Sequence, residues 1–471
     1  MSATRGLAQA LVGMVLLALL AASVAGGGRP SSRLQASGWL ALEPVVPALR
    51  AQQAPRGSSA EAVAIGDVTG DHRNDLVLVT SFNNSPKYDF RLWVFAQTPS
   101  GALASPVIYP TAATYPNRAE SLAVGDATGD GRADVLLAVR DVGVQVFPQQ
   151  RSGRLGSPTT VGAAGDSYVI ALGRLNGDRN LDLAAVGFST ETASVALNGS
   201  GTIGSPSSYS ARHEGFEDLE VADVTGDGRD DLVLMSGQGY EAPNLSVLAQ
   251  LPEGGFGPPA EYRLAGRTLT HGLGVGDVTG DGRQDVVLSS GFNAPAYITV
   301  FAQRPDGTLA SPVSHRTHEF PAAVEVRDFN RDHHADVVVR HSDRIGVYLQ
   351  LRGGRLSREQ FLSIPPGTSV SPQSVAIGDL NADGAPDLAL ADGTYGPGVF
   401  WSMLGRPHCV VPKVLGQSLR MARRSIARAH CSLGRVRQRQ SSAGRRLVQG
   451  QRPRAGKRLP RGSAVNLVLG G

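Results

Sequence analysis

Seven short acidic loops recur along the chain, and their oxygen-bearing side chains are the residues best suited to chemistry. The second loop runs from Asp126 to Asp134 and carries hydroxyl or carboxylate oxygens at its positions 1, 3, 5 and 9. Alternate residues of a tight loop point inward, so these oxygens, with a backbone carbonyl at position 7, can surround a hard cation. Glycine at position 4 or 6 permits the positive φ that such a turn needs. The pattern predicts structural calcium binding.

Six of the loops carry the complete ligand set, so we expect up to six Ca²⁺ sites. In four of them Thr replaces the usual Asp or Asn at position 3, which gives a weaker or water-mediated ligand. The predicted ligands are Asp67, Thr69, Asp71 and Asp75; Asp126, Thr128, Asp130 and Asp134; Asp223, Thr225, Asp227 and Asp231; Asp277, Thr279, Asp281 and Asp285; Asp328, Asn330, Asp332 and Asp336; and Asp379, Asn381, Asp383 and Asp387.

The third loop departs from the pattern because Arg174 replaces its first Asp, while Asn176, Asp178 and Asp182 remain. We expect no ion in this degenerate loop. A guanidinium forms strong hydrogen bonds with carboxylates, so Arg174 is expected to neutralise Asp178 and Asp182 in place of an ion.

None of the six complete loops is an EF-hand, because position 12 is Leu or Val instead of the bidentate Glu that an EF-hand requires. The alternative to calcium is that the loops are polar turns in which Asp side chains accept backbone N–H groups. Three carboxylates at the same spacing in six loops would repel one another without a counter-ion, which favours calcium.

The loops are spaced by 59, 48, 49, 54, 51 and 51 residues, and a period near fifty indicates a repeat architecture. Each repeat has an alternating strand before the loop, an apolar strand after it, a third strand, and a fourth that follows a Gly-x-Leu or Gly-x-Ile turn and a Pro. Four strands in each repeat are typical of a propeller blade. The predicted fold is therefore mainly β, a seven-bladed β-propeller of four-stranded blades.

The last repeat lacks the fourth-strand signature, whereas residues 38–50 resemble it. We therefore predict that residues 38–50 complete the last blade and close the ring, which removes two exposed sheet edges. The alternative is that this segment is a loose linker. The predicted propeller spans residues 38–404.

The first 25 residues have the pattern of a secretory signal peptide, with Arg5, an apolar stretch, and small residues at Ser23 and Ala25. An uncleaved N-terminal membrane anchor is the alternative. Residues 26–37 are a predicted linker rich in Gly, Ser and Arg. We expect a secreted protein or one associated with the cell surface or cell wall.

Charge separates the two ends of the molecule. Residues 406–461 contain 16 Arg and Lys residues and no Asp or Glu, whereas the remainder carries 29 basic and 41 acidic residues. A basic tail indicates an anionic surface partner. A genomic bias toward Arg is the competing explanation, because 42 of the 45 basic residues are Arg.

A small α+β module is predicted after a short linker at residues 405–408. Leu419, Ala422, Ile426 and Ala429 mark one face of a short helix, and strands are predicted over residues 437–440, 447–451 and 465–469. The chain has only two cysteines, Cys409 and Cys431, and in an exported chain they are expected to form a disulfide rather than a metal site.

The repeats resemble the FG-GAP or VCBS repeats of integrin alpha-subunit propellers and of many exported bacterial proteins, over residues 60–404. The loop, its flanking strands and the number of repeats all agree. The resemblance implies a seven-bladed propeller with calcium held between the first two strands of each blade. Arg174 and the Thr substitutions depart from the family pattern.

The tail resembles the PASTA domain over residues 409–471. The resemblance rests on the Cys409–Gly416 segment, Cys431, Gly434, and the closing Val465–Val468 segment. That family is associated with penicillin-binding proteins and receptor kinases and is linked to recognition of peptidoglycan. This implies a partner in peptidoglycan or another anionic cell-wall polymer.

No catalytic motif is present: the chain has no His-Glu-x-x-His, Gly-x-Ser-x-Gly, Walker-type loop or Cys-x-x-Cys. His315, His318, His333 and His334 are expected at the surface rather than in a zinc site. We therefore expect no catalytic residues.

The favoured hypothesis is an exported, non-enzymatic, calcium-stabilised binding, adhesion or scaffold protein with an unknown protein or glycan partner. We expect a monomer that binds no nucleic acid. The rival hypothesis is a secreted polysaccharide hydrolase or lyase with its site at the central channel of the propeller. Carboxylates that converge in the channel outside the seven loops would favour the rival.

Overall fold

The structure is a computed structural model, and the ranges of the chain that it describes are separated by gaps. The predicted signal peptide, the linkers at residues 26–37 and 405–408, and Asp383 lie outside these ranges. The described ranges are 43–44, 59–81, 89–115, 117–162, 167–199, 201–237, 244–264, 269–292, 295–364, 373–382, 384–392, 399–404, 409–429, 431–438, 447–459 and 463–470.

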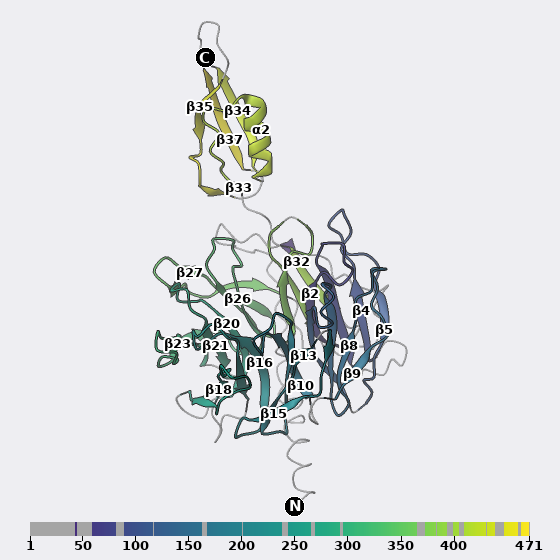
Figure 1. Ribbon diagram of the computed structural model, residues 1–471. Helices are drawn as coiled ribbons and strands as arrows, with labels where there is room; N and C mark the ends of the chain where they lie inside the picture. Colours follow the sequence, from purple (N-terminus) through teal and green to yellow (C-terminus); the bar gives the residue numbers. More distant parts are fainter. Residues whose placement is uncertain are drawn as a thin grey trace, which may run out of the picture. The chain divides into compact units, whose positions relative to one another are not determined.

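Seven four-stranded antiparallel sheets form the larger part of the described chain (Figure 1). Sheets one to four consist of β2 (Ser59–Gly66), β3 (Asp75–Ser81), β4 (Arg91–Phe95) and β5 (Val107–Pro110); β6 (Ala119–Gly125), β7 (Asp134–Val139), β8 (Gly143–Phe147) and β9 (Thr159–Val161); β10 (Ser167–Gly173), β11 (Asp182–Gly187), β12 (Thr192–Ala196) and β15 (Ser207–Ser210); and β16 (Phe216–Ala222), β17 (Asp231–Ser236), β18 (Leu245–Leu248) and β19 (Ala260–Tyr262).

The remaining three sheets follow the same plan. They consist of β20 (Thr270–Gly276), β21 (Asp285–Ser290), β22 (Ala296–Phe301) and β23 (Val313–Thr317); β24 (Val324–Arg327), β25 (Asp336–Arg340), β26 (Arg344–Tyr348) and β29 (Gln360–Ser363); and β30 (Val375–Gly378), β31 (Asp387–Asp392), β32 (Val399–Leu404) and β1 (Glu43–Pro44). The third and sixth sheets also carry small hairpins, formed by β13 (Asn198–Gly199) with β14 (Thr202–Ile203) and by β27 (Gln350–Leu351) with β28 (Arg355–Leu356).

These sheets are the propeller-like blades that the repeat period predicts. The first strand of each blade contacts the first strand of the next, in the order β2, β6, β10, β16, β20, β24 and β30, and β30 contacts β2. The first strands therefore form an inner ring. The second strands are buried along their length where burial is described in full, as in β3 and β7, because they pack between neighbouring blades. Among the outer strands, β5 alternates between partly buried and exposed residues, and β9 is mostly exposed.

Apolar side chains between neighbouring blades form the core. One cluster joins Val77 and Leu92 of the first blade to Leu122 and Val135 of the second. Another joins the first blade to the seventh, with Trp93 packed in the same cluster as Ala389. Burial of this kind is the main favourable term in folding, so each blade is stabilised chiefly by its neighbours.

The seventh blade takes its outer strand from the N-terminal side of the chain. β1 pairs antiparallel with β32, with Glu43 opposite Leu404 and Pro44 opposite Met403. Of the segment 38–50 that we assign to this blade, Glu43 and Pro44 are the described residues. Their pairing covers the open edge of β32.

The C-terminal unit is a small α+β fold. Helix α2 (Leu419–Arg428) begins at the N-cap Ser418 and buries Ala422 and Ile426. A three-stranded sheet has the order β34 (Ser432–Gln438), β37 (Ala464–Gly470) and β35 (Leu447–Arg452), and β33 (Cys409–Val410) pairs with β36 (Arg458–Leu459).

Two predictions for this unit can be checked directly. Cys409 and Cys431 form the predicted disulfide. The predicted strand at residues 437–440 begins earlier than expected, at Ser432, because Leu433 and Val436 pack against the same core as the helix. In the part of the chain that the structure describes, no helix has the length and apolar character needed to cross a membrane.

Candidate functional site

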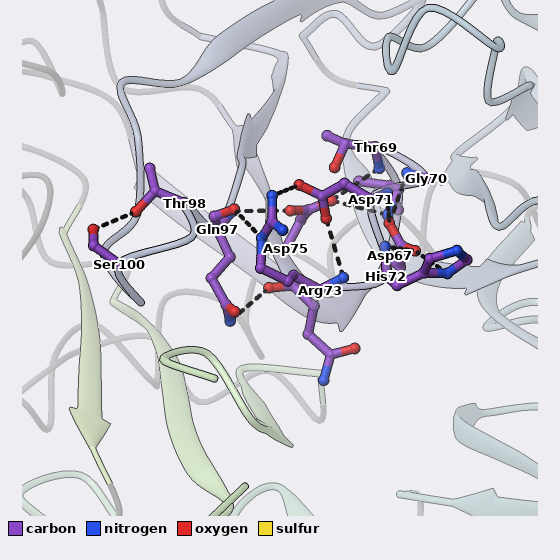
Figure 2. A network of polar contacts seen from close by, with 12 residues as sticks. Asp67, Thr69, Gly70, Asp71, His72, Arg73, Asp75, Gln97, Thr98 and Ser100 are labelled. Carbon is purple, nitrogen blue, oxygen red and sulfur yellow. Dashed lines mark hydrogen bonds and ion pairs between the residues drawn. The ribbon is translucent and has the colours of Figure 1, made fainter. Parts of the chain in front are cut away.

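The acidic loops connect the first and second strands of each blade, as predicted, and their ninth residue is fully buried. Asp75 represents the set: its Oδ2 accepts the N–H groups of Val68 (3.0 Å) and Thr69 (2.9 Å), and its Oδ1 accepts the N–H of Gln97 (2.9 Å). Figure 2 shows this network in the first loop. The ninth residue therefore ties its loop to the end of the third strand of the same blade. The ninth residues are Asp75, Asp134, Asp182, Asp231, Asp285, Asp336 and Asp387, each with 0% of its surface exposed.

Burial raises the pKa of the ninth-residue carboxyl in the first six loops, and the backbone N–H donors act in the opposite direction. The pKa of Asp75 is raised, that of Asp231 is raised to about 6, and that of Asp336 to about 7. In the sixth loop the nearby Asp332 and Asp328 carboxylates contribute to the rise.

The first residue of each complete loop also accepts backbone N–H groups. Asp67 Oδ1 accepts from Gly70 (2.6 Å) and Asp71 (3.1 Å), and its Oδ2 accepts from His72 (2.7 Å). Asp328 holds Asp332 and His333 in the same way in the sixth loop. The first and ninth residues therefore act as caps of the turn, which is the alternative that the sequence leaves open.

The fifth residue forms an ion pair with an arginine at position 7 in four loops. The pairs are Asp71 with Arg73, Asp130 with Arg132, Asp227 with Arg229, and Asp281 with Arg283. In the first loop the Arg73 Nε also donates to the carbonyl of Gln97 (3.0 Å). The repulsion that we expected to require a metal counter-ion is thus offset by a side chain. Position 7 is His334 in the sixth loop and Ala385 in the seventh.

A glutamine or asparagine in the next blade reaches each of six loops. Gln149 Nε2 donates to the carbonyl of Asp67 (3.1 Å), and Gln97 Nε2 donates to Asp379 (3.0 Å), which joins the first blade to the seventh. The other members are Asn198, Gln250, Gln303 and Gln350, which donate to Ala127, Arg174, Asp223 and Asp277 respectively. We call this set the junction amides.

The sequence contains a signal for the junction amides that our prediction did not use. In every case the Gln or Asn lies two residues beyond the last residue of the third strand, as in Phe95-Ala96-Gln97 and Phe147-Pro148-Gln149. The residues are almost fully buried. A buried amide at a constant position in successive repeats indicates a hydrogen-bond partner.

The degenerate third loop differs from our expectation. Asp178 accepts hydrogen bonds from the Asn176 side chain (3.1 Å) and the Asn180 N–H (2.8 Å), and Asp182 accepts from Leu175 (2.8 Å). No ion pair within the described residues joins Arg174 to either carboxylate. The reason is that amide donors inside the loop already satisfy both Asp side chains.

The loops contain the right kind of atom for a hard cation, but those atoms do not converge. The Oγ1 atoms of Thr69, Thr128, Thr225 and Thr279 are buried, and each hydroxyl lies close enough to the ninth-residue Asp of its own loop to lower the pKa of that carboxyl. However, no group of three or more His, Cys, Asp or Glu side chains in the described ranges is arranged to hold a metal ion. The donor chemistry therefore fits calcium, whereas binding would require the carboxylates to exchange their present partners.

A second set of carboxylates lies in the central channel, outside the loops. Asp218, Glu220 and Glu325, together with Arg327, line a cavity of about 220 Å³ bounded by first strands of six blades. Asp218 accepts the N–H groups of Leu219 and Leu273, both at 3.0 Å. Arg327 Nε lies 3.6 Å from Glu325 Oε2. We call Asp218, Glu220 and Glu325 the channel carboxylates.

Burial is the main cause of the raised pKa of each channel carboxylate. The pKa of Asp218 rises to about 7 and that of Glu220 to about 8, and in both cases neighbouring carboxylates add to the effect. The pKa of Glu325 is raised by burial and lowered by Arg327. Three acids therefore share a small space that is only partly open to solvent, since the Glu325 side chain keeps 29% of its surface exposed.

Our sequence prediction missed the channel carboxylates, although the repeats contain a signal. The position of Glu220 and Glu325 in the first strand is Ala or Gly in the other five repeats. Those residues are Ala64, Ala123, Ala171, Gly274 and Ala376. A charged residue at a position that holds Ala or Gly in the other repeats indicates that the inner ring is lined differently in these two blades.

The four histidines that we placed at the surface differ in exposure. His333 and His334 are exposed, whereas His315 and His318 are partly buried. His318 packs edge-on against His341, which is fully buried and whose Nε2 lies 2.9 Å from Glu359 Oε1. This network joins the segment that follows the outer strand of the fifth blade to the sixth blade.

Comparison with protein families agrees with the repeat architecture. The FG-GAP-like repeat model matches residues 67–137, 223–288, 277–339 and 328–390, which together make up more than half of the chain. The chain therefore belongs to the FG-GAP-like repeat family. The PASTA domain model matches residues 410–471. The matches leave out residues 138–222, which contain the degenerate third loop, although the structure forms an ordinary blade there.

Solved structures share the fold at low sequence identity. BBS1N in complex with ARL6DN, in a crystal soaked with mercury, is 12% identical, covers 78% of this chain and 98% of its own, and gives a TM-score of 0.52. The same complex soaked with lead gives 0.51 at the same identity. An Agrocybe aegerita lectin that recognises non-reducing terminal N-acetylglucosamine is 19% identical, with 71% and 85% coverage and a TM-score of 0.49. No curated protein matches the chain.

Proposed function

We propose that this chain is an exported, non-enzymatic binding protein whose propeller displays a recognition surface and whose PASTA domain docks on the anionic cell wall. The observation that carries the proposal is the charge of residues 405–471, which contain 16 Arg and Lys residues and no Asp or Glu. No acidic side chain of this domain can neutralise its arginines, so the domain attracts polyanions. The disulfide and the PASTA domain fit an extracellular protein.

The propeller contributes rigidity rather than chemistry in this proposal. Its loop carboxylates are engaged by backbone N–H groups and by arginines, as in the Asp71–Arg73 pair. We assign recognition to the less regular segments that lie between the acidic loops. Connecting segments on a rigid scaffold commonly carry binding residues.

Cell-wall docking is tested by sedimentation of the full chain with purified cell walls. We expect the full chain to sediment with the walls and a variant that ends at Leu404 to stay in solution. Equal sedimentation of both proteins would contradict the proposed role of the PASTA domain.

Structural calcium is part of the proposal, and the sixth loop is the best candidate because it lacks an Arg at position 7 and all four of its predicted ligand residues are described; the seventh loop also lacks this Arg, but its Asp383 lies outside the described ranges. Asp328, Asn330, Asp332 and Asp336 would supply the ligands in the sixth loop. A bound ion that favours the native state raises stability by mass action, so EDTA should lower the melting temperature and Asp332→Asn should reduce that effect. An unchanged melting curve in EDTA, together with no calcium by elemental analysis, would contradict calcium binding.

A second candidate function is polysaccharide hydrolysis or cleavage at the channel. The channel carboxylates are the observation that favours it, since a glycosidase needs one protonated and one ionised carboxyl group. Burial raises the pKa of a carboxyl group and can keep it protonated at neutral pH. The cavity of about 220 Å³ is smaller than most ligand pockets. Release of reducing ends from wall polysaccharides that is abolished in Glu220→Gln and Glu325→Gln would support this candidate over the binding protein.

A further inference from the structure

The sheet of the PASTA domain has a groove on the face opposite to helix α2. On β37, Val465, Leu467 and Leu469 belong to the core that the helix covers, whereas Asn466 and Val468 alternate with them. The groove has a volume of about 520 Å³, and residues of all three strands line it, including Arg435, Arg437 and Arg452.

The register of the strands arranges these side chains in two rows across the sheet. In the first row, Arg452 lies opposite Asn466, which is also close to Arg435. In the second row, Val468 has Arg437 opposite it on one strand and Gly450 opposite it on the other. The Gly450 position has no side chain, which leaves room above Val468. The first row is therefore polar and basic, and the second row has an open, apolar floor.

Asn466 is held in a fixed orientation within the first row. Its Oδ1 accepts the backbone N–H of Arg435 at 2.7 Å. A Cβ atom at Gly434 would lie 2.3 Å from this Oδ1, so glycine at that position preserves the contact. Because the oxygen is used, the Asn466 NH₂ group is the part of the side chain left to donate to a ligand.

The three groove arginines are exposed, and no carboxylate side chain exists between residues 405 and 471 to pair with them. Arg435 and Arg437 are alternate residues of one strand, which places their Cα atoms about 6–7 Å apart. A guanidinium binds phosphate or carboxylate through two parallel hydrogen bonds. The groove therefore offers two or three anion-binding groups at a regular spacing.

We propose that this groove binds a phosphodiester polymer of the cell envelope, with successive phosphates on Arg435 and Arg437 and the Arg452 and Asn466 donors on the adjoining unit. A polymer with one charge in each repeating unit matches evenly spaced arginines, and the strong positive charge of the domain favours a polyanion over a single anionic group. The inference rests on the proposed cell-wall function and names the polymer that the domain recognises.

The test measures binding of the full chain to soluble poly(glycerol phosphate) and to two cell-wall preparations. One preparation keeps its phosphodiester polymers and the other has lost them through hydrofluoric acid treatment. Arg435→Ala/Arg437→Ala removes two groove charges. Arg423→Ala/Arg424→Ala is the matched control, because both residues are exposed on helix α2 and the net charge changes equally.

We expect the groove variant to bind poly(glycerol phosphate) at least about tenfold more weakly, because charge-assisted hydrogen bonds are lost. The helix variant should lose much less affinity. Gly450→Leu fills the groove without a change in charge and should also weaken binding; a Cβ atom there would make only ordinary contacts, the nearest at 3.5 Å from Val468. Melting curves check that each variant is folded.

The outcomes separate the groove from the wider proposal. Equal losses in the groove and helix variants, or normal binding by Gly450→Leu, would overturn the groove site while leaving wall docking intact. Equal binding to the two wall preparations would overturn the phosphodiester ligand and assign docking to peptidoglycan itself. Failure of the unmodified chain to bind any wall would contradict the proposed function.

Discussion

At the scale of single residues, carboxylates of similar type have different roles because their surroundings differ. Asp75 is buried and accepts three backbone N–H groups, whereas Asp71 is partly exposed and pairs with Arg73. Glu220 lines the channel cavity, where its neighbours include other acids. Burial and the neighbouring acids raise the pKa of Glu220 to about 8 although Arg327 opposes the shift, so the ionisation of Glu220 should have a clear effect on stability.

Glu220→Gln is expected to stabilise the propeller at high pH. The native carboxyl has its pKa raised to about 8 from 4.5 by burial and by Asp218 and Glu325, with Arg327 acting in the opposite direction. Between these pH values the folded chain holds a proton that the unfolded chain releases, so this group makes stability fall as pH rises. The variant lacks this loss, with a gain of up to about 4 kcal/mol at pH 8, reduced by the partial solvent exposure of Glu220, and almost none at pH 4.

Urea unfolding at pH 4, 6 and 8 measures this difference. Glu253→Gln is the control because Glu253 is exposed in the fourth blade, and it should show no such trend. A constant difference between Glu220→Gln and the unmodified chain at the three pH values would contradict the argument.

At the scale of elements, each acidic loop is a joint between blades. In five loops the junction amide of the next blade donates to the carbonyl of the first residue, and in the second loop Asn198 donates to that of the second residue, Ala127. In five blades a hairpin glycine packs against a residue at position 3 of a neighbouring loop. Gly354, for example, lies so close to Thr279 that an added Cβ atom would be 1.6 Å from its carbonyl oxygen. The Gly-x-Leu turn in the sequence is thus required by contact with a neighbouring blade.

Gln149→Ala is expected to destabilise the chain by about 1–3 kcal/mol, because it removes the hydrogen bond to Asp67 and leaves a buried gap. Gln150→Ala should change stability by less than about 0.5 kcal/mol, since Gln150 is exposed. Chemical unfolding of both variants measures the difference. Similar stability of the two would show that the junction amide does not hold the blades together.

Gly354→Ala should be more damaging than Gly353→Ala, although both glycines have a positive φ, of 72° and 85°. Each substitution costs about 1–2 kcal/mol of backbone strain. At Gly353 a Cβ atom meets nothing within 4 Å, whereas at Gly354 it meets the Thr279 backbone, which should add about 1–3 kcal/mol. Melting temperatures that fall equally in the two variants would argue against this contact between blades.

At the scale of the whole molecule, the propeller and the C-terminal unit are stabilised in different ways. The propeller closes its ring through the contacts of β2 with β30 and β31 and through β1 on β32. The C-terminal unit has too few residues for a large core, and its disulfide joins residues that are 22 positions apart. Each unit should therefore respond to a different perturbation.

Reduction of the disulfide is expected to destabilise the C-terminal unit by about 3 kcal/mol, because a closed loop of this length limits the unfolded chain. Hydrogen–deuterium exchange followed by mass spectrometry reports on each unit separately. Exchange in α2 and β34 should accelerate on reduction, while exchange in β7 should not change. Acceleration in both units, or in neither, would contradict a local role for Cys409–Cys431.

Much of the fold follows from local sequence pattern. The period near fifty residues, the apolar runs and the turn residues determine the strands of each blade, because hydrophobic alternation and turn chemistry act over a few residues. The same holds for the helix at Leu419–Arg428 and for the cysteine pair. The acidic positions of the loops were also visible, but not the partners of those acids, since Arg73 was not recognised as a counter-charge.

The sequence by itself determined the family, the repeat count and the strand order within a blade, because each of these depends on residues close together in the chain. Only the tertiary structure decided which groups the closed ring and the C-terminal sheet bring together. Gln97 donates to Asp379, 282 residues away, and Asp218 and Glu325 meet in one channel. Such contacts depend on the curvature of the whole ring and the register of its strands, which no local pattern specifies.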